Sequence, residues 1–242
     1  MKVRRNFLPS ILTILNLFAG FLALLQISRG HYITAVELMI VALIFDGLDG
    51  KIARLTHQTS DFGIEFDSLC DMVSFCLVPA VLIHEIFVSE LGLIGGLISF
   101  FPLLFGGVRL ARFNLQDGTG KKSYFIGMPT PTSALTIGSY VWFSHKVLGN
   151  YGNPKIILPL VVVLSFLMVS NIRFSTALQL SLRKSFLNIF KIGLALIMIA
   201  GILVFNGYVI FPLMMIYIIT HLLQWLIGYD EPRVHLARRK AH

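Results

Sequence analysis

The chain has 242 residues, of which 56% are hydrophobic and only 13% are charged, and its formal net charge is +8. Soluble domains carry about 25% charged residues, so this composition argues against an ordinary soluble fold. The basic residues lie mainly between long apolar blocks, which favours contacts with anionic lipid headgroups or phosphates and gives no indication of nucleic acid as a partner.

Eight apolar blocks follow one another along the chain, and each is close to the roughly 20 residues that a helix needs to cross a bilayer. They lie near residues 7–28, 32–54, 62–88, 92–113, 128–149, 155–172, 187–206 and 208–227. The predicted fold is all-α, a polytopic transmembrane helical bundle that forms one integral membrane domain over residues 1–242. The last two blocks are separated only by Asn206-Gly207, which predicts a tight helical hairpin.

The basic residues predict the orientation of this bundle. With eight spans and a cytoplasmic N-terminus, all but three of the 20 Lys and Arg residues fall on the cytoplasmic side. The exceptions are Arg29, Lys146 and Lys155. This bias agrees with the positive-inside rule. We therefore expect a multi-pass protein of the cell membrane with both termini in the cytoplasm.

Four aspartates lie in or at the end of apolar blocks, where a charged side chain is costly. Ionisable residues inside membrane segments are rare and point to function. Asp46 and Asp49 end the second apolar block, and Asp67 and Asp71 lie within the third. Spacings of three and four residues place the members of each pair on one helix face. Two adjacent helices can therefore direct four carboxylates into one cavity.

Such a cluster needs cations, because four close anions repel one another. Carboxylate oxygens suit hard divalent ions such as Mg²⁺ or Mn²⁺, and four of them are enough for a two-metal centre that clamps phosphoryl groups. Gly50, Ala53 and Gly63 lie near the acidic faces and leave room for a bulky ligand, and Arg54 can contact a phosphate or pair with an acid. Close helix packing is the alternative explanation for the small residues.

Residues 46–71 carry a pattern that resembles the signature of the CDP-alcohol phosphatidyltransferases. The pattern is D-x-x-D-G-x-x-A-R, eight residues, then G-x-x-x-D-x-x-x-D. Its fixed positions are all matched, by Asp46, Asp49, Gly50, Ala53, Arg54, Gly63, Asp67 and Asp71. The resemblance implies a membrane enzyme that transfers a phosphatidyl group from a CDP-linked lipid to an alcohol.

The resemblance also implies a role for each signature residue. Asp46, Asp49 and Asp67 are expected to bind divalent metal, Mg²⁺ or Mn²⁺, as two ions. Asp71 is expected to be both a ligand and the general base that deprotonates the acceptor hydroxyl. The expected CDP-lipid-binding residues are Gly50, Ala53, Arg54 and Gly63. A homodimer with its active site facing the cytoplasm is a further implication.

Three features are similar to the branch of the family that uses serine. They are the run Arg109-Leu110-Ala111-Arg112-Phe113-Asn114, the segment Gly127-Met128-Pro129-Thr130-Pro131, and eight spans where the family core has six. The N-terminal segment is also similar, with Pro9, Thr13 and Asn16, although Ser10 stands where the family often has Asn. L-serine is therefore the expected acceptor, and inositol phosphate and glycerol 3-phosphate are the alternatives.

The resemblance to the family does not extend over the whole chain. It is good over roughly residues 5–135, and the catalytic core is expected over about 5–173. Residues 187–227 then form an extra C-terminal helical pair that carries no motif. Direct displacement of CMP is the expected chemistry, since no Cys, His or Ser stands out as a covalent nucleophile.

Two questions stay open at this level. Arg109 and Arg112 can bind the phosphate or carboxylate of a substrate, or they can be charges that set topology and reach toward the interface. Ion or proton transport is the alternative function of a different class, because intramembrane acids also mark transport pathways. Against transport, the chain has one acidic cluster and no counterpart in its second half.

Overall fold

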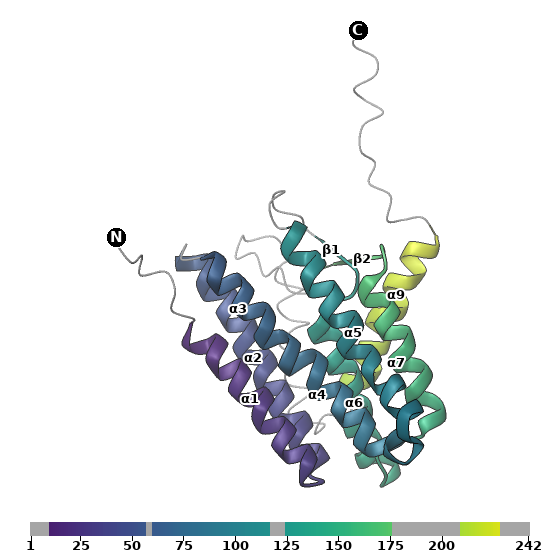
Figure 1. The fold of residues 1–242 in the computed structure, drawn as a ribbon. Coiled ribbons are helices and arrows are strands. Elements are labelled where there is room, and N and C mark those ends of the chain that lie inside the picture. The colour runs from purple at the N-terminus through teal and green to yellow at the C-terminus, as the bar shows by residue number, and fades with distance from the viewer. Residues whose placement is uncertain (1–9, 57–59, 117–123, 176–208, 228–242) are drawn as a thin grey trace.

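The computed structural model describes residues 10–56, 60–116, 124–175 and 209–227, and within them the chain is a bundle of helices lying side by side (Figure 1). The α-helices are α1 (Ile11–Ser28), α2 (Tyr32–Thr56), α3 (Asp61–Asp71), α4 (Val78–Ile83), α5 (Gly92–Gln116), α6 (Thr130–Leu148), α7 (Pro154–Val169) and α9 (Ile210–Leu226). The predicted helical class is confirmed. The blocks near 7–28, 32–54, 62–88, 92–113, 128–149, 155–172 and 208–227 coincide with helices, and the block at 187–206 lies outside the described residues.

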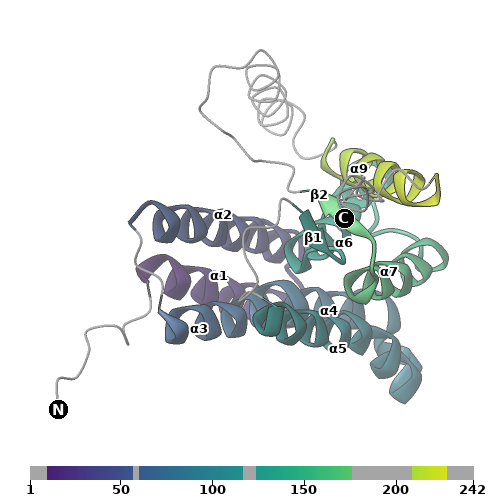
Figure 2. The same ribbon diagram turned by 90° about the horizontal axis from the view of Figure 1, so that it is seen from above.

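From α1 to α7 the helices alternate in direction, with α3 and α4 as parts of one continuous helical stretch, so the described chain passes repeatedly between two ends of the bundle (Figure 1). Seen from above, α1 lies between α2 and α3 (Figure 2). α5 packs against α7, and α9 packs on the outside of α6. The core is apolar and contains the fully buried side chains of Val36, Phe75 and Ile137. This arrangement places α1, α2, α3 and α5 around one end of the bundle.

The rod that begins with α3 does not stay a regular α-helix. A π-helical segment, η1 (Met72–Leu77), follows Asp71 directly, and a second, η2 (His84–Val88), follows α4. Pro79 has no N–H and cannot continue the regular hydrogen-bond ladder. The preceding turn is widened, and the N–H of Val78 bonds to the carbonyl of Val73. Such π segments are common at functional sites, and this one begins directly after Asp71.

Two glycines let neighbouring helices approach η1 closely. A Cβ atom added at Gly20 of α1 would collide with the Ser74 Oγ, and one added at Gly106 of α5 would collide with the Cys76 Sγ. Beyond η2, the 3-10 turn η3 (Ser89–Leu91) leads to Gly92. The φ of Gly92 is 53°, in the left-handed region that favours glycine, and there the chain reverses into α5.

A short antiparallel ribbon, absent from the predicted all-α fold, joins β1 (Tyr124–Ile126) to β2 (Arg173–Ser175). Next to it, the N–H of Gly127 donates to the Ile172 carbonyl at 2.8 Å, and the N–H of Met128 donates to the Leu167 carbonyl at 2.9 Å. The Gly127–Pro131 segment is thereby fixed to the end of α7. The predicted span 155–172 ends early, at Val169, because Ser170 turns to extended backbone and leads toward the ribbon.

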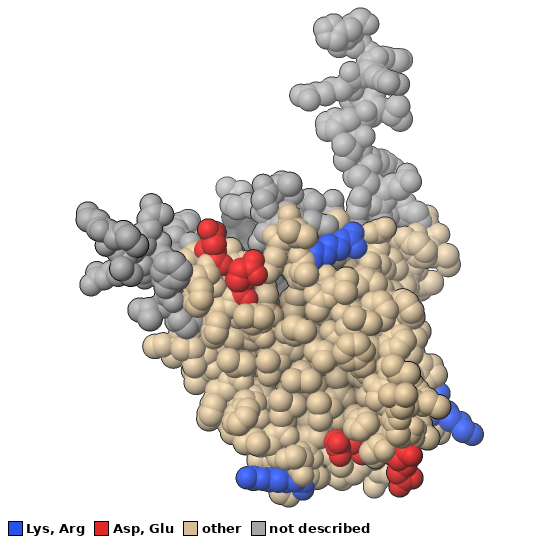
Figure 3. Space-filling view, in the orientation of Figure 1, with Lys and Arg blue, Asp and Glu red and all other residues tan. Residues whose placement is uncertain are grey.

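The surface supports a membrane protein. Ile11–Ser28 and the folded stretch Asp61–Leu115 are long and apolar enough to cross a bilayer, and Pro154–Val169 and Ile210–Leu226 are shorter apolar helices. Large apolar side chains are exposed on the outer faces, Phe18 and Leu97 among them. Figure 3 shows charged side chains near the two ends of one face and an uncharged band between them. Soluble proteins rarely expose apolar surface of this extent.

Candidate active site

Three of the four predicted aspartates, carried by α2 and α3, come together in the structure. Asp46 of α2 and Asp67 and Asp71 of α3 each offer a carboxylate oxygen, and these atoms lie within 4.8 Å of one another. All three residues are half-buried. The i, i+4 spacing of Asp67 and Asp71 gives them one helix face, and the packing of α1 against both α2 and α3 holds the two helices together. We call Asp46, Asp67 and Asp71 the acidic group.

Asp49, the fourth predicted aspartate, stands beside the acidic group. Its side chain is 9% exposed, and its Oδ2 accepts a hydrogen bond from the Thr13 Oγ1 of α1. Asp49 still interacts electrostatically with Asp67. The structure therefore brings Asp49 next to the other three, and a side chain of α1 holds its carboxylate.

Asn16, also on α1, binds an aspartate of α3, as Thr13 binds one of α2. Its Nδ2 donates to the Asp71 Oδ1 at 3.1 Å, and its backbone carbonyl accepts from the Ser74 Oγ at 3.1 Å. The sequence analysis named Thr13 and Asn16 only as part of the resemblance of the N-terminal segment and assigned them no role. The available signal was the i, i+3 spacing of two polar residues in an otherwise apolar helix, which places both on one face.

The acidic group fits a divalent metal. The Asp67 Oδ1 is buried and accepts no hydrogen bond from any described residue. A buried acceptor without a partner costs about 1–3 kcal/mol, and more when it is charged. Three carboxylates within 4.8 Å of one another also repel. Hard oxygen donors that converge in this way match the ligands that Mg²⁺ and Mn²⁺ take in proteins.

Arg109 lies on the inner face of α5. It is only 8% exposed, and its Nη1 donates to the Thr130 Oγ1 at 3.3 Å. Its guanidinium stands 5.8 Å from the centroid of the Phe113 ring, and its charge interacts with those of Asp71 and Asp46. The Arg109 Nε is buried and has no partner among the described residues. A side chain that reaches toward the membrane–water interface would be exposed. The burial of Arg109 therefore argues against the interpretation of this residue as a charge that only sets topology.

Arg112 is placed differently, one turn further along α5. Its Nη1 donates to the Val169 carbonyl at 3.2 Å, and its Nη2 donates to the Asn171 Oδ1 at 3.0 Å. Both acceptors lie at or just past the end of α7, whose last carbonyls have no partner within the helix. Arg112 therefore links α5 to the end of α7.

The predicted CDP-lipid residues are only partly described. Gly50 is exposed on α2, one turn after Asp46. The N–H of Gly63 donates to the Ser60 Oγ at 3.0 Å, which caps the start of α3, and a Cβ at Gly63 would lie 3.1 Å from that oxygen. α2 continues through Ala53 and Arg54, but their side chains lie outside the described part of the structure.

A polar network joins α3 to α5 on the outer side of the acidic group. The Ser68 Oγ donates to the Asn114 Oδ1 at 3.1 Å, and the Asn114 Nδ2 donates to the Glu65 Oε2 at 3.0 Å. Glu65 is exposed. Asn114, the last residue of the Arg109–Asn114 run, thus holds the outer face of α3 against α5.

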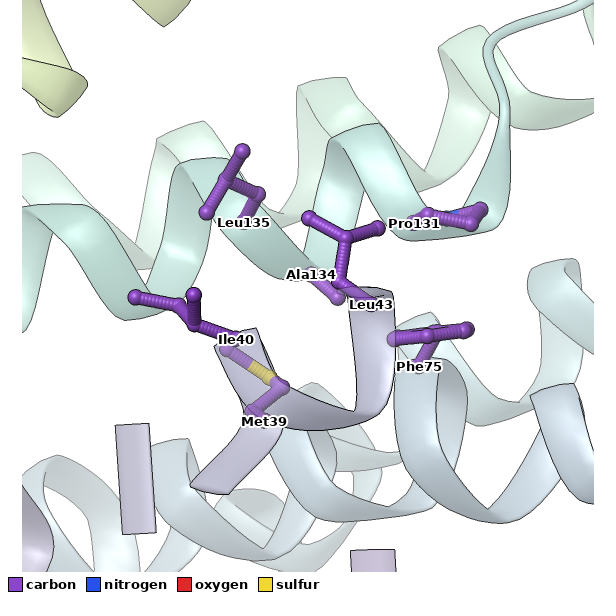
Figure 4. A pocket seen from close by; sticks show the side chains of 7 residues that line it. All are labelled: Met39, Ile40, Leu43, Phe75, Pro131, Ala134 and Leu135. Atoms are coloured by element: carbon purple, nitrogen blue, oxygen red, sulfur yellow. The ribbon is translucent and has the colours of Figure 1, made fainter. Parts of the chain in front are cut away.

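An apolar pocket lies about one turn further into the bundle (Figure 4). Its empty space, open solvent included, is only about 150 Å³, and it is lined by Met39, Ile40 and Leu43 of α2, Phe75 of η1, and Pro131, Ala134 and Leu135 of α6. Pockets for drug-sized ligands measure about 300–1,000 Å³. The pocket is therefore too small and too apolar to receive a nucleotide, and the acidic group remains the candidate site.

Comparison with known proteins identifies the family of this chain. Residues 6–166 match the CDP-alcohol phosphatidyltransferase family. Two similar proteins are CDP-diacylglycerol–serine O-phosphatidyltransferases of Helicobacter pylori strains. One is 35% identical over 219 residues, with 90% of each chain covered, and the other is 40% identical over 167 residues, with 69% of this chain and 70% of the relative covered. An archaetidylserine synthase of Methanothermobacter thermautotrophicus is 37% identical over 169 residues, 69% of each chain.

The match includes the whole signature of residues 46–71 and covers well over half of the chain. This chain therefore belongs to the CDP-alcohol phosphatidyltransferase family.

Proposed function

We propose that this chain transfers the phosphatidyl group of CDP-diacylglycerol to the hydroxyl of L-serine, giving phosphatidylserine and CMP. The convergence of Asp46, Asp67 and Asp71 is the observation that carries the chemistry. The names of the relatives support the acceptor, since two are serine O-phosphatidyltransferases and a third is an archaetidylserine synthase. The names differ in the lipid group, phosphatidyl in two and archaetidyl in the third, but all three name serine.

Divalent metal belongs to this proposal. We assign Asp46, Asp49, Asp67 and Asp71 as the ligands of two ions, either Mg²⁺ or Mn²⁺. Bound ions of this kind supply positive charge that binds a pyrophosphate and stabilises the charge that develops during phosphoryl transfer. The assignment is supported by the Asp67 Oδ1, which has no partner in the described part of the chain, and by the close approach of three carboxylates.

Asp71 is assigned as the general base. It takes the proton from the serine hydroxyl, and the serine oxygen forms a bond to the β-phosphorus of the CDP-lipid. The bond from that phosphorus to the oxygen of CMP breaks, so CMP leaves and the proton remains on Asp71. General-base catalysis contributes about 10²–10⁴ to a rate. The Asn16 amide donates to the Asp71 Oδ1 and thereby orients this carboxylate.

Arg109 is assigned to the acceptor. A guanidinium binds carboxylates and phosphates through paired N–H groups, and the buried Nε of Arg109 is an unused donor among the described contacts. Its interaction with Asp71 puts it within electrostatic reach of the proposed base. It therefore suits the serine carboxylate. The contacts of Arg112 to Val169 and Asn171 support a packing role, which makes Arg112 the weaker of the two predicted binding residues.

The CDP-lipid is assigned to the surface formed by Gly50, Ala53, Arg54 and Gly63. The positions of Gly50 and Gly63 on α2 and α3, the two helices that carry the acidic group, support this assignment. An Arg at position 54 would pair with a phosphate of the substrate.

The protein is proposed to be a single multi-pass domain of the cell membrane with a cytoplasmic active site. The alternating helices place Arg29, Lys146 and Lys155 at one end of the bundle and Lys51, Arg109 and Arg112 toward the other. The acidic group lies toward the second end, which the positive-inside rule assigns to the cytoplasm. We further propose that the chain has eight spans with both termini in the cytoplasm and that it forms a homodimer. Its catalytic core lies over residues 5–173, and an extra C-terminal helical pair lies over residues 187–227.

The same chemistry with inositol phosphate or glycerol 3-phosphate is the alternative of the same class, and ion or proton transport is the alternative of another class. One assay separates them. Protein purified in detergent is given CDP-diacylglycerol, Mn²⁺ or Mg²⁺ and one of the three acceptors, and CMP release is measured. We expect release with serine alone. Release with another acceptor would replace the substrate, and no release from folded, metal-loaded protein would overturn the function.

A further inference from the structure

α1 supplies polar groups to both acidic helices. Thr13 and Asn16 lie one turn apart on α1, and both are buried. The Thr13 hydroxyl donates to Asp49 of α2, and the Asn16 amide donates to Asp71 of α3. One face of α1 therefore links a carboxylate of the first aspartate pair to a carboxylate of the second.

The Asn16 amide is only half satisfied. Its side chain is 0% exposed, and its Oδ1 is buried with no hydrogen-bond partner among the described residues. The orientation of the amide is fixed chemically, because an exchange of nitrogen and oxygen would place the Asn16 oxygen 3.1 Å from a carboxylate oxygen. The amide thus donates to Asp71 and leaves an unpaired oxygen beside the acidic group.

An unpaired buried oxygen beside converging carboxylates indicates that the site is complete only when it holds a cation. The Asp67 Oδ1 is unpaired in the same way. Amide and carboxylate oxygens are both suitable neighbours for hard divalent ions. Residues that hydrogen-bond to metal ligands fix their orientation, and their loss typically lowers metal affinity or activity by about 10–100-fold.

We propose that Thr13 and Asn16 are positioning residues for the metal-binding carboxylates, with Thr13 orienting Asp49 and Asn16 orienting Asp71. The inference rests on the proposed function in one respect, that these carboxylates bind divalent metal. It does not depend on the identity of the acceptor. α1 is then a part of the metal site that contributes no aspartate.

Mn²⁺ binding to the purified full-length protein without substrates tests this directly. Asn16→Leu keeps much of the side-chain volume and removes the amide, and Thr13→Val keeps the shape and removes the hydroxyl. We expect each to weaken Mn²⁺ binding by about 10–100-fold. Thr13→Ser restores the hydroxyl and is expected to bind Mn²⁺ within about threefold of the wild type.

The matched control is Thr136→Val. Thr136 is also fully buried, but its Oγ1 donates to the Thr132 carbonyl of its own helix at 2.7 Å, away from the carboxylates. Melting temperatures measured in EDTA report folding separately from metal affinity. If Asn16→Leu fails to fold, the comparison of Thr13→Val with Thr13→Ser tests the inference. Wild-type affinity in folded Thr13→Val and Asn16→Leu overturns the inference alone. Failure of the wild type to bind Mn²⁺ overturns both it and the proposed metal site.

Discussion

The Arg109 guanidinium donates to the Thr130 hydroxyl at 3.3 Å, and this contact joins α5 to the first residue of α6. Arg109 opens the Arg109–Asn114 run, and Thr130 belongs to the Gly127–Pro131 segment. These are two of the features that resemble the serine-using branch of the family, and they meet at one buried contact beside the acidic group. The ribbon of β1 and β2 fixes the segment that supplies Thr130.

The first prediction concerns Arg109. Arg109→Lys keeps the charge but loses the planar pair of donors, so we expect the KM for serine to rise at least tenfold while the KM for CDP-diacylglycerol changes little. Steady-state kinetics with each substrate varied in turn measures both. Arg29→Lys, an exposed change at the opposite end of the bundle, is the matched control. An unchanged KM for serine would remove Arg109 from the acceptor site.

The second prediction concerns the base. Asp71→Asn keeps the shape of the side chain and removes its capacity to accept a proton, so CMP release should fall by at least about 10²–10⁴. The control is Asp61→Asn, which changes an exposed aspartate in the first turn of α3. If Asp71→Asn retained more than a tenth of the wild-type rate, another group would have to be the base.

The third prediction concerns the effect of metal on stability. A ligand that binds only the folded state stabilises it by about 2.7 kcal/mol at a concentration one hundred times its Kd. For a chain of this size, each kcal/mol corresponds to about 2–4 °C in the melting temperature. Mn²⁺ should therefore raise the melting temperature by several degrees, and EDTA should reverse the shift. Asp67→Asn should lose most of this shift, and an equal shift in Asp67→Asn would contradict metal binding by Asp67.

The fourth prediction compares two glycines of α5. A Cβ at Gly106 would collide with the Cys76 Sγ and lie 3.2 Å from the Cys76 Cβ, whereas a Cβ at Gly96 would have no atom within 4 Å among the described residues. Overpacking costs about 1–3 kcal/mol, and Ala in place of Gly within a helix contributes about 0.5–1 kcal/mol of stability. Gly106→Ala should thus lower the melting temperature and Gly96→Ala should not. Equal effects would mean that α5 and η1 are not in close contact.

Sequence reasoning was most successful where a period or a spacing carries the information. Within the described residues, long apolar blocks predicted where helices begin and end to within a few residues. The i, i+3 and i, i+4 spacings predicted which aspartates share a face, and Asp46, Asp67 and Asp71 do converge. The structure adds that Ser10, which stands where the family often has Asn, caps α1, a role that Asn also fills.

What sequence reasoning missed depends on contacts between segments. Three-residue strands have too little pattern to be recognised, and the ribbon forms because residues 124–126 and 173–175 meet at the end of α7. The π-helical turn before Pro79 interrupts a helical stretch whose apolar residues otherwise follow the regular α-helical period, and that period gave no sign of it. The pairing of Asn16 with Asp71 spans 55 positions, and the choice between the environments of Arg109 and Arg112 required the position of α7.

The central claim is that the hydroxyl oxygen of serine becomes bonded to the phosphorus of the lipid. Serine labelled with ¹⁸O in its hydroxyl group, incubated with the protein, CDP-diacylglycerol and Mn²⁺, tests it by mass spectrometry of both products. Direct displacement predicts phosphatidylserine that retains the label and CMP that contains none. No labelled phosphatidylserine, or label in CMP, would contradict the proposed reaction.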